Sequence, residues 1–578
     1  MIRFYSVALA LLLVWLPASI FAQTISSLSP ASGNAGTLVT LTGTSLNLVT
    51  AVAVNGTAGV ILNKTGTSLR LLVMPGTTSG TITVTGPATA TSSATFTLTR
   101  TALTTTQQGP KLVGTGAVGT GAAQGQSVAL SADGNTLAVG ASADNANAGA
   151  TWIFTRTGTA WSQQGAKLVG IGAIGTGAAQ GQSVALSADG NTLAVGASAD
   201  NANAGATWIF TRTGTAWSQQ GAKLVGTGAV GTAAFQGFSV ALSADGNTLA
   251  MGAPGDINLT GATWIFTRLG TAWSQQGPKL VGIGTNGAIS QQGFSVALSA
   301  DGNTLAAGAP SDALDTGATW VFTRTGMTWS QQGAKLVGTG ASGLYGAAQG
   351  NSVALSADGN TLAAGGPSDN RFDGATWVFA RTGTAWSQQG SKLSGTGTLG
   401  NATFQGSSVA LSADGNTLAA GDPANDTNLG ATWVFTRTGT VWSQPNPKLV
   451  GTGAILGPVQ QGHAVALSAD GSTLATGGLK DNNNLGATWV FSTASSLLAQ
   501  RAAIGPQVSA NFFPNPIAEQ LTVIGGAHTG TLRLFDGTGR TLFIGAYQNG
   551  QPLDFSFLPA GLYWLALDQA PARPILKR

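Results

Sequence analysis

Aspartate is the residue type on which acid-base or metal chemistry in this chain would depend. The chain has no cysteine, its two histidines are His463 and His528, and its glutamate is Glu519. Without thiols there are no disulfides and no thiolate catalysis, and two isolated histidines do not make a His-rich metal site. Catalytic or metal-binding groups therefore have to be sought among the aspartates.

One aspartate recurs eight residues before a tryptophan, in a loop that also holds Gly. The positions are Asp144, Asp200, Asp256, Asp312, Asp369 and Asp481, with Asn425 in the seventh place. Two of these loops carry a second carboxylate, Asp315 in "SDALDTG" and Asp373 in "SDNRFDG". Calcium takes six or more oxygen ligands, so Asp312, Asp315, Asp369 and Asp373 are the candidate calcium ligands. Asp and Asn also form turns, which explains the recurrence without metal.

A repeat of about 56 residues positions these loops. The stretch "SADGNTLA" begins at Ser131 and recurs with a period of 56 residues, except for one step of 57, and its seventh copy reads "SADGSTLA". Each unit holds four short strand-like segments bounded by turn residues. In the first unit they are "QSVALSA" (126–132), "NTLAVGA" (135–141), "ATWIFTR" (150–156) and "TAWSQQGAKLVG" (159–170). This period with four strands predicts one β-propeller blade, and "SADGNT" predicts a hairpin connector with Asp-Gly at the tight turn.

The number of strand-like segments predicts how the ring closes. A fourth-strand sequence, "TQQGPKLVG" (106–114), precedes the first unit, whereas the last unit ends at "GATWVFSTASS" (486–496) without one. A strand from the N-terminal end that completes the last blade would protect the edges that an open array exposes. We therefore expect a closed seven-bladed propeller over residues 106–497.

The units resemble the FG-GAP repeat, the blade type of integrin α-subunit heads and of many bacterial surface proteins. The resemblance rests on stretches such as "GFSVALSADGNTLAMGAPGD" (237–256). Calcium-binding members of that family carry a D-x-D/N-x-D/N-G cage between the first two strands. Here "SADGNT" supplies a single carboxylate, so the resemblance does not extend to that cage.

The N-terminal segments predict export and a small sandwich. Residues 1–22 combine Arg3, an apolar run and Ala22 before a plausible cleavage site, which is typical of a secretory signal peptide. Residues 23–102 alternate apolar residues with Thr and Ser, as in "GTLVTLTG" (36–43), which predicts short half-buried strands. This segment resembles the immunoglobulin-like IPT/TIG domain, whose members act as spacers or interaction modules.

Residues 505–578 differ in character and predict a further small β-sandwich. They contain "FFPNPIAEQLTV" (512–523), "LRLFDGTGRTL" (532–542) and "LPAGLYWLAL" (558–567). These motifs resemble the type A C-terminal sorting domain of the type IX secretion system. The resemblance implies export across the outer membrane of a gram-negative bacterium, followed by release or attachment at the cell surface.

Charge and hydropathy exclude several classes of partner. Charged residues make up 8% of the chain and the net charge is +4, without a Lys/Arg cluster, so nucleic acid is not an expected partner. Past the N-terminal run no stretch is apolar enough to cross a bilayer, so we expect no transmembrane span in the mature chain. We expect a monomer, and a fold class that is all-β throughout.

Differences among the units locate a candidate ligand face. The turns after the first and third strands barely change, whereas the loops after the second and fourth strands vary, and in a propeller these two variable sets lie at one end. The distinctive side chains there are Tyr345, Arg371, Phe372 and Phe404.

Two side-chain series have structural interpretations. We assign the third-strand tryptophans to the core between blades rather than to a sugar-stacking ladder, and we expect the arginines that follow them to be solvated charges. The tryptophans are Trp152, Trp208, Trp264, Trp320, Trp377, Trp433 and Trp489. The arginines are Arg156, Arg212, Arg268, Arg324, Arg381 and Arg437.

These features favour a secreted or surface-displayed, non-enzymatic protein that binds an extracellular protein or glycan. The near identity of the first two units argues against catalysis, which needs one asymmetric group of separately tuned residues. One alternative is an extracellular polysaccharide- or peptide-degrading enzyme that uses Asp369 and Asp373. A structural surface-layer protein is the other.

Overall fold

The structure is a computed structural model in which the chain falls into two units, up to Ala499 and from Gln500. It describes residues 22–99, 106–287, 289–342, 346–455, 457–492, 511–513, 519–524, 529–536, 541–548, 550–567 and 573–577. The predicted signal peptide lies outside these residues except for Ala22. Within the described segments, no helix is both long and apolar enough to span a membrane.

An eight-stranded immunoglobulin-like sandwich forms the N-terminal part, as predicted. Its strands are Thr24–Ser29 (β1), Ser32–Gly33 (β2), Leu38–Thr44 (β3), Ala51–Val54 (β4), Thr57–Lys64 (β5), Ser68–Leu72 (β6), Gly80–Thr85 (β7) and Thr89–Leu98 (β8), with a 3-10 turn at Leu46–Leu48. They are ordered β1-β3-β6-β5-β4-β7-β8-β2. Alternate residues such as Leu41, Leu69, Val84 and Phe96 point inward and are fully buried.

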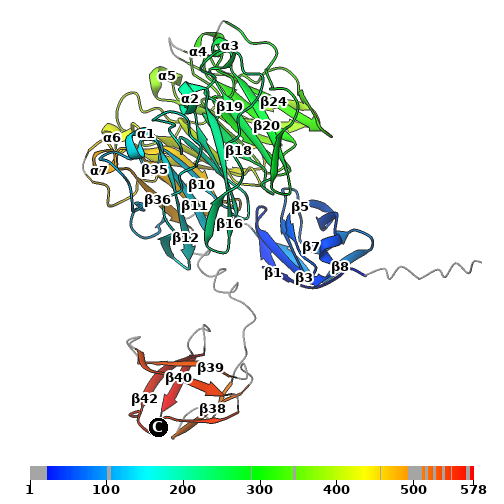
Figure 1. Cartoon of the computed structure of the whole chain (residues 1–578), viewed down its shortest axis with the longest axis vertical. Coiled ribbons are helices and arrows are strands. Elements are labelled where there is room, and N and C mark those ends of the chain that lie inside the picture. Colours follow the sequence, from blue (N-terminus) through cyan, green and yellow to red (C-terminus); the bar gives the residue numbers. More distant parts are fainter. Residues whose placement is uncertain are drawn as a thin grey trace, which may run out of the picture. The chain divides into compact units, whose positions relative to one another are not determined.

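Seven four-stranded antiparallel sheets follow within residues 106–492, and they make a β-propeller (Figure 1). The first strands are Ser127–Leu130 (β10), Ser183–Leu186 (β14), Ser239–Leu242 (β18), Ser295–Leu298 (β22), Ser352–Leu355 (β26), Ser408–Leu411 (β30) and Gln461–Leu467 (β34). The second strands are Thr136–Ala141 (β11), Thr192–Ala197 (β15), Thr248–Ala253 (β19), Thr304–Ala309 (β23), Thr361–Gly366 (β27), Thr417–Asp422 (β31) and Thr473–Gly478 (β35). Consecutive first strands contact one another in a closed ring, so they are the innermost strands.

The outer two strands complete each blade. The third strands are Ala150–Thr157 (β12), Ala206–Thr213 (β16), Ala262–Leu269 (β20), Ala318–Thr325 (β24), Ala375–Thr382 (β28), Ala431–Thr438 (β32) and Ala487–Ser492 (β36). The fourth strands are Ala160–Gln163 (β13), Ala216–Gln219 (β17), Ala272–Gln275 (β21), Thr328–Gln331 (β25), Ala385–Gln388 (β29), Val441–Ser443 (β33) and, for the last blade, Thr106–Gln107 (β9). Antiparallel pairing of β9 with β36 joins the two ends of the repeat array, as predicted.

The "SADGNT" turns are hairpin connectors that also meet one another. In the first blade, the Oδ1 of Asp133 accepts hydrogen bonds from the Ser131 hydroxyl at 2.6 Å and from the Asn135 backbone at 3.0 Å, and Gly134 has φ +64°. The alanine of each turn donates its N–H to the alanine carbonyl of the next blade at 2.7–3.0 Å. The seven donors in order are Ala132, Ala188, Ala244, Ala300, Ala357, Ala413 and Ala469, and the last bonds back to the first. A closed circle of backbone hydrogen bonds therefore ties the blades together at this end.

Within the same unit, the sandwich covers this alanine circle. Leu38, Leu72 and Met74 form one apolar cluster with alanines of the turns. The Asn34 amide donates to the Asp470 carbonyl at 3.0 Å. A side chain at Gly36 would collide with the Ala469 backbone, since a Cβ there would lie 2.4 Å from the Ala469 carbonyl carbon. The N-terminal sandwich is thus seated on the end of the propeller where the turns are alike in all blades.

The third-strand tryptophans are core residues, as expected. All seven have no exposed surface, so they cannot stack against a ligand. In the first blade, the indole Nε1 of Trp152 donates to the Thr115 carbonyl at 2.7 Å, and a Cβ at Gly114 would lie 2.1 Å from the Trp152 ring. Each tryptophan therefore fixes the chain that crosses into its blade.

The expectation of solvated arginines is wrong. The guanidinium of Arg212 donates to Asn191 within its own blade, and to Thr136 and Gln164 of the blade before, at 2.9–3.3 Å. It also lies 5.4 Å from the centre of the Trp217 ring. Burial lowers the pKa of Arg212. The arginines are clamps between blades, because a half-buried guanidinium can donate hydrogen bonds in several directions at once.

The C-terminal unit is a small all-β domain of two sheets, as predicted. Its strands are Asn511–Phe513 (β37), Gln520–Ile524 (β38), Thr529–Phe535 (β39), Thr541–Gln548 (β40), Pro552–Asp554 (β41), Gly561–Leu567 (β42) and Arg573–Lys577 (β43). The sheet orders are β37-β38-β41 and β40-β39-β42-β43. Leu521, Leu534, Phe555 and Leu565 form its buried core.

Candidate ligand-binding face

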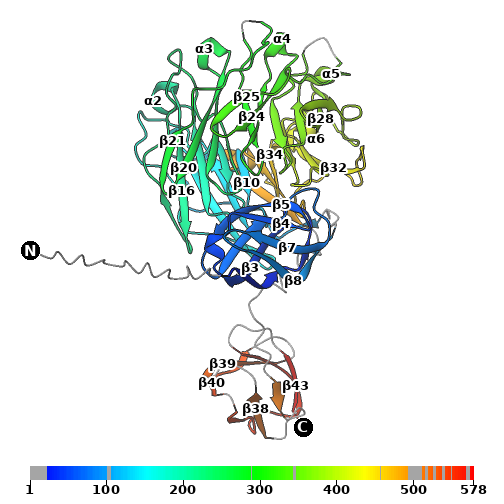
Figure 2. The same ribbon diagram turned by 90° about the vertical axis from the view of Figure 1, so that its right-hand side faces the viewer.

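The loops that vary among the blades gather at the end opposite the alanine circle. The loops after the second strands contain short turns, which Figures 1 and 2 show along the same side of the sheets. They are Asp144–Asn147 (α1), Asp200–Asn203 (α2), Asp256–Leu259 (α3), Asp312–Asp315 (α4), Asp369–Phe372 (α5), Asn425–Asn428 (α6) and Asp481–Asn484 (α7). Each turn accepts a hydrogen bond from the crossover that enters the next blade, as the Asn147 carbonyl does from the Ala179 N–H at 2.8 Å. Both variable loop sets therefore share one face, as predicted.

The recurring aspartate of each turn is a buried structural residue. In the first blade, one oxygen of Asp144 forms an ion pair with Lys167, and the other accepts the Val118 backbone N–H at 2.7 Å. The same arrangement recurs in Asp200–Lys223, Asp256–Lys279, Asp312–Lys335, Asp369–Lys392 and Asp481–Lys111. Lys111 follows the closing strand β9, so the Lys111–Asp481 pair also joins the two ends of the repeat array. The carboxylate therefore holds the backbone of the crossover loop in place.

The four candidate calcium ligands are not brought together as a cage. The carboxylates of Asp312 and Asp369 are fully buried and paired with lysine, whereas Asp315 and Asp373 are exposed. Asp373 accepts a hydrogen bond from the Asn370 amide at 2.8 Å. Within the described residues, no three His, Cys, Asp or Glu side chains are grouped closely enough to hold a metal. Calcium binding therefore stays a prediction from the sequence.

Two of the four candidate ligand-binding residues meet at the boundary between the fifth and sixth blades. The rings of Phe372 and Phe404 lie 5.5 Å apart, and the Phe404 N–H donates to the Phe372 carbonyl at 2.8 Å. Arg371 is exposed beside them. Tyr345 lies outside the described residues. This boundary therefore presents an aromatic pair with one cation.

A ring of residues at the inner edge of this face, which we call the rim, was not predicted from the sequence. In six blades the rim residue lies just before the innermost strand, in the seventh it lies within β34, and its type differs strongly between blades. The seven are Gln126, Gln182, Phe238, Phe294, Asn351, Ser407 and His463. Neighbours touch, since the rings of Phe238 and Phe294 lie 4.7 Å apart and the Asn351 amide donates to the Ser407 carbonyl at 3.0 Å. Comparing the blades at this one variable position, within an otherwise constant stretch, would have revealed the rim.

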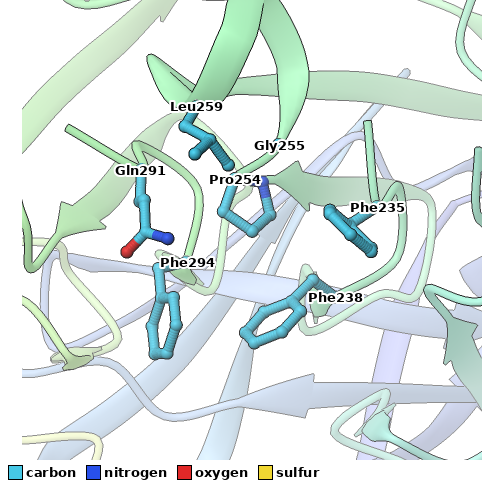
Figure 3. Close-up of a pocket in the computed structure, with 7 residues that line it drawn as sticks. All are labelled: Phe235, Phe238, Pro254, Gly255, Leu259, Gln291 and Phe294. Atoms are coloured by element: carbon cyan, nitrogen blue, oxygen red, sulfur yellow. The ribbon is translucent and has the colours of Figure 1, made fainter. Parts of the chain in front are cut away.

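The two rim phenylalanines line a cavity of about 120 Å³. Its walls are Phe235, Phe238, Pro254, Gly255, Leu259, Gln291 and Phe294. Figure 3 shows the rings of Phe238 and Phe294 beside one another, with Phe235 on one side and Gln291 on the other. A Cβ at Gly255 would lie 2.4 Å from the Phe235 ring, so this glycine makes room for the aromatic wall. The other turns carry Ala, Ser or Lys at that place.

The sixth blade departs from the aspartate–lysine pattern. Lys448 donates to neutral Asn425, and a carboxylate occurs instead at Asp422, where the other blades have Ala or Gly. Burial raises the pKa of Asp422 to about 7, against the opposing effect of hydrogen bonds from Thr403, Asn425 and Ala424. At the rim of the next blade, burial and then the positive charge of Lys480 lower the pKa of His463 to about 4.

Comparison with known proteins identifies the N-terminal sandwich. The IPT/TIG domain family matches residues 24–99, as expected. No curated protein matches the chain. Among solved structures, the β-propeller domain of Cps50 (Swd1) from Myceliophteria thermophila is similar at 12% identity and a TM-score of 0.40, over 66% of this chain and 99% of that one. A TM-score this low carries no argument, so the propeller assignment rests on the sheet topology.

Removing one lysine tests the structural role of the aspartates. Lys279→Met keeps an apolar side chain of similar length but removes the ammonium, which lies 5.5 Å from the centre of the Trp264 ring and pairs with the buried carboxylate of Asp256. We expect a loss of about 3–5 kcal/mol in the free energy of unfolding. Lys448→Met is the matched control, because its partner is the neutral Asn425, and we expect a loss of about 1 kcal/mol. Equal losses in urea titrations would contradict the assignment.

Replacing Asp422 tests its raised pKa. The folded state holds this proton more tightly than the unfolded chain, whose ordinary value is 3.8, so the stability contribution of Asp422 is full below pH 4 and falls as pH rises to about 7. Asp422→Ala should remove this fall and raise the free energy of unfolding at pH 8 by on the order of 3 kcal/mol.

His463 acts with the opposite sign in the same range, since stability linked to it is present above pH 6.5 and is lost as pH falls through about 4. The wild-type curve should therefore be nearly flat from pH 4 to 7, whereas that of Asp422→Ala should rise. A variant whose stability keeps a constant offset from wild type at every pH would show that Asp422 is ionised in the folded state.

Proposed function

We propose that this protein is a non-enzymatic binding protein of the extracellular space that recognises a protein or a glycan through the variable end of its propeller. One observation carries the proposal: side chains that differ between blades are concentrated at one end, while the contacts that hold the blades together repeat from blade to blade. Loops on a rigid scaffold are where recognition residues are found. The rim and the Phe372–Phe404 pair are the distinctive surfaces at that end.

The states of the titratable groups favour binding over catalysis. A hydrolase built on Asp369 and Asp373 needs both carboxylates at the surface, yet Asp369 is buried and paired with Lys392. His463, with a pKa of about 4, is a poor base at neutral pH. Asp422 is fully buried behind the loops.

Both ends of the sequence support an extracellular location. The signal-peptide pattern of residues 1–22 and the resemblance of residues 505–578 to a type IX sorting domain are consistent with export to the outer surface of a gram-negative bacterium. The small share of charged residues and the many Ser, Thr and Asn residues suit a neutral exterior. In this proposal, the propeller is the recognition module, and the C-terminal unit is an address for secretion.

Screening the full chain against arrayed glycans and extracellular matrix proteins, with calcium and then with a chelator, tests the proposal. Binding should fall at least tenfold in Phe372→Asn/Phe404→Ala, which installs residue types found at the same places in other blades. Val441→Ala at the opposite end, where most blades have Ala, should bind like wild type. Loss with chelator would add calcium to the site. Turnover of a polysaccharide or peptide, or no binding in either condition, would contradict the proposal, and the latter would favour a surface coat.

A further inference from the structure

The strained backbone between blades points to where a ligand is held. At every blade boundary, the last residue of the turn and a residue of the next crossover both have positive φ and share a backbone hydrogen bond. The pairs are Asn147–Ala179, Asn203–Phe235, Leu259–Gln291, Asp315–Ala348, Phe372–Phe404, Asn428–Gln460 and Asn484–Ala123. Asn and Asp tolerate the left-handed conformation, whereas bulky apolar residues rarely adopt it.

Bulky apolar residues at these positions are confined to blades three to six. Leu259 has φ +72°, Phe235 +56°, Phe372 +74° and Phe404 +67°. Asparagine in the first, second, sixth and seventh turns shows that the fold accepts the unstrained choice at the turn position, which Leu259 and Phe372 occupy. Strain that the fold does not require is typical of a functional site. Leu259 and Phe235 are two walls of the cavity between the third and fourth blades.

The lining of this cavity selects the chemistry of its ligand. Five of its seven lining residues have apolar side chains and a sixth is glycine. The seventh is Gln291, whose side-chain oxygen already accepts a hydrogen bond from Ser311 at 3.0 Å. A sugar placed there would lose water from its hydroxyl groups without gaining enough partners. The volume of about 120 Å³ is far below that of a drug-sized ligand site and suits one side chain.

The surrounding loops add apolar surface and no net charge. Val230 is 51% exposed, Ile289 is 46% exposed and Leu259 is 37% exposed. In residues 227–237, 254–261 and 283–293, the one charged residue is Asp256, which Lys279 neutralises. Nothing in these loops is suited to an anionic glycan, whereas an uncharged apolar surface complements a peptide segment with few charges.

We infer that the cavity between the third and fourth blades is an anchor site for a single leucine or phenylalanine side chain of a partner protein. Phe238 and Phe294 pack against the inserted side chain, and Leu259, Phe235 and Pro254 close around it. This inference rests on the proposed function and narrows its partner class from protein or glycan to protein.

Short acetylated peptides with a Gly-Ser frame and a central leucine, phenylalanine, alanine or asparagine test the inference on the full chain by ligand-observed NMR. Magnetisation transfer should reach the leucine and phenylalanine side chains and not those of alanine or asparagine. Phe238→Gln/Phe294→Gln, which installs the rim residue of the first two blades, should weaken binding at least tenfold. Val441→Ala, at the opposite end of the propeller, should leave it unchanged.

Leu259→Asn separates loss of the site from loss of the fold. This variant installs the residue that four other blades use there with positive φ, so its melting temperature should stay level or rise while peptide binding falls at least tenfold. Unchanged binding in Leu259→Asn or in the double variant would overturn the inference. If the leucine and phenylalanine peptides fail while an arrayed glycan still binds the variable end, the anchor site is wrong and the proposed function stands. If neither class binds there, both fail.

Discussion

Ring closure is the constraint on which the rest of this structure depends. Seven backbone hydrogen bonds among the turn alanines form a circle, and it closes only if every blade delivers the same turn to the same place. The closing strand β9 and Lys111 complete the last blade with the contacts that the other blades make within themselves. The single step of 57 residues accordingly falls in the 339–350 crossover, at the end away from the circle. Variation is tolerated only where closure does not depend on it.

Polar contacts within and between blades explain how a chain with so few charges stays ordered. Each lysine–aspartate pair is buried against a tryptophan, and each arginine clamp crosses to the preceding blade, so these charges contribute inside the scaffold rather than at its surface. Loss of either partner of a buried ion pair is destabilising, because the other charge is left uncompensated. The lysine–aspartate pattern is therefore resistant to change. In the sixth blade, neutral Asn425 takes the place of the aspartate as the partner of lysine, so the fold tolerates an uncharged partner there. This blade instead buries the carboxyl group of Asp422.

Periodicity made most of the fold predictable, because strand length, turn chemistry and the orphan fourth strand are all local patterns. The buried tryptophans and the hairpin role of "SADGNT" followed from the same patterns. Three features could not be predicted from these patterns: the alanine circle, the packing of the sandwich on it, and the arginine clamps. Each depends on residues of different blades or domains that meet only in the closed ring. The cavity lined by Phe235, Phe238 and Phe294 was not predicted for the same reason, although the loop sequences did single out Phe372 and Phe404.

We assign a structural role to one end of the propeller and propose recognition for the other. Hydrogen exchange of the full chain, with and without a partner obtained from the array, tests this division most directly. We predict that bound partner slows exchange in the crossovers and turns of the variable end, above all in residues 227–237, 254–261 and 283–293, and leaves the "SADGNT" turns unchanged. Slowed exchange confined to those turns or to the IPT/TIG sandwich would contradict it.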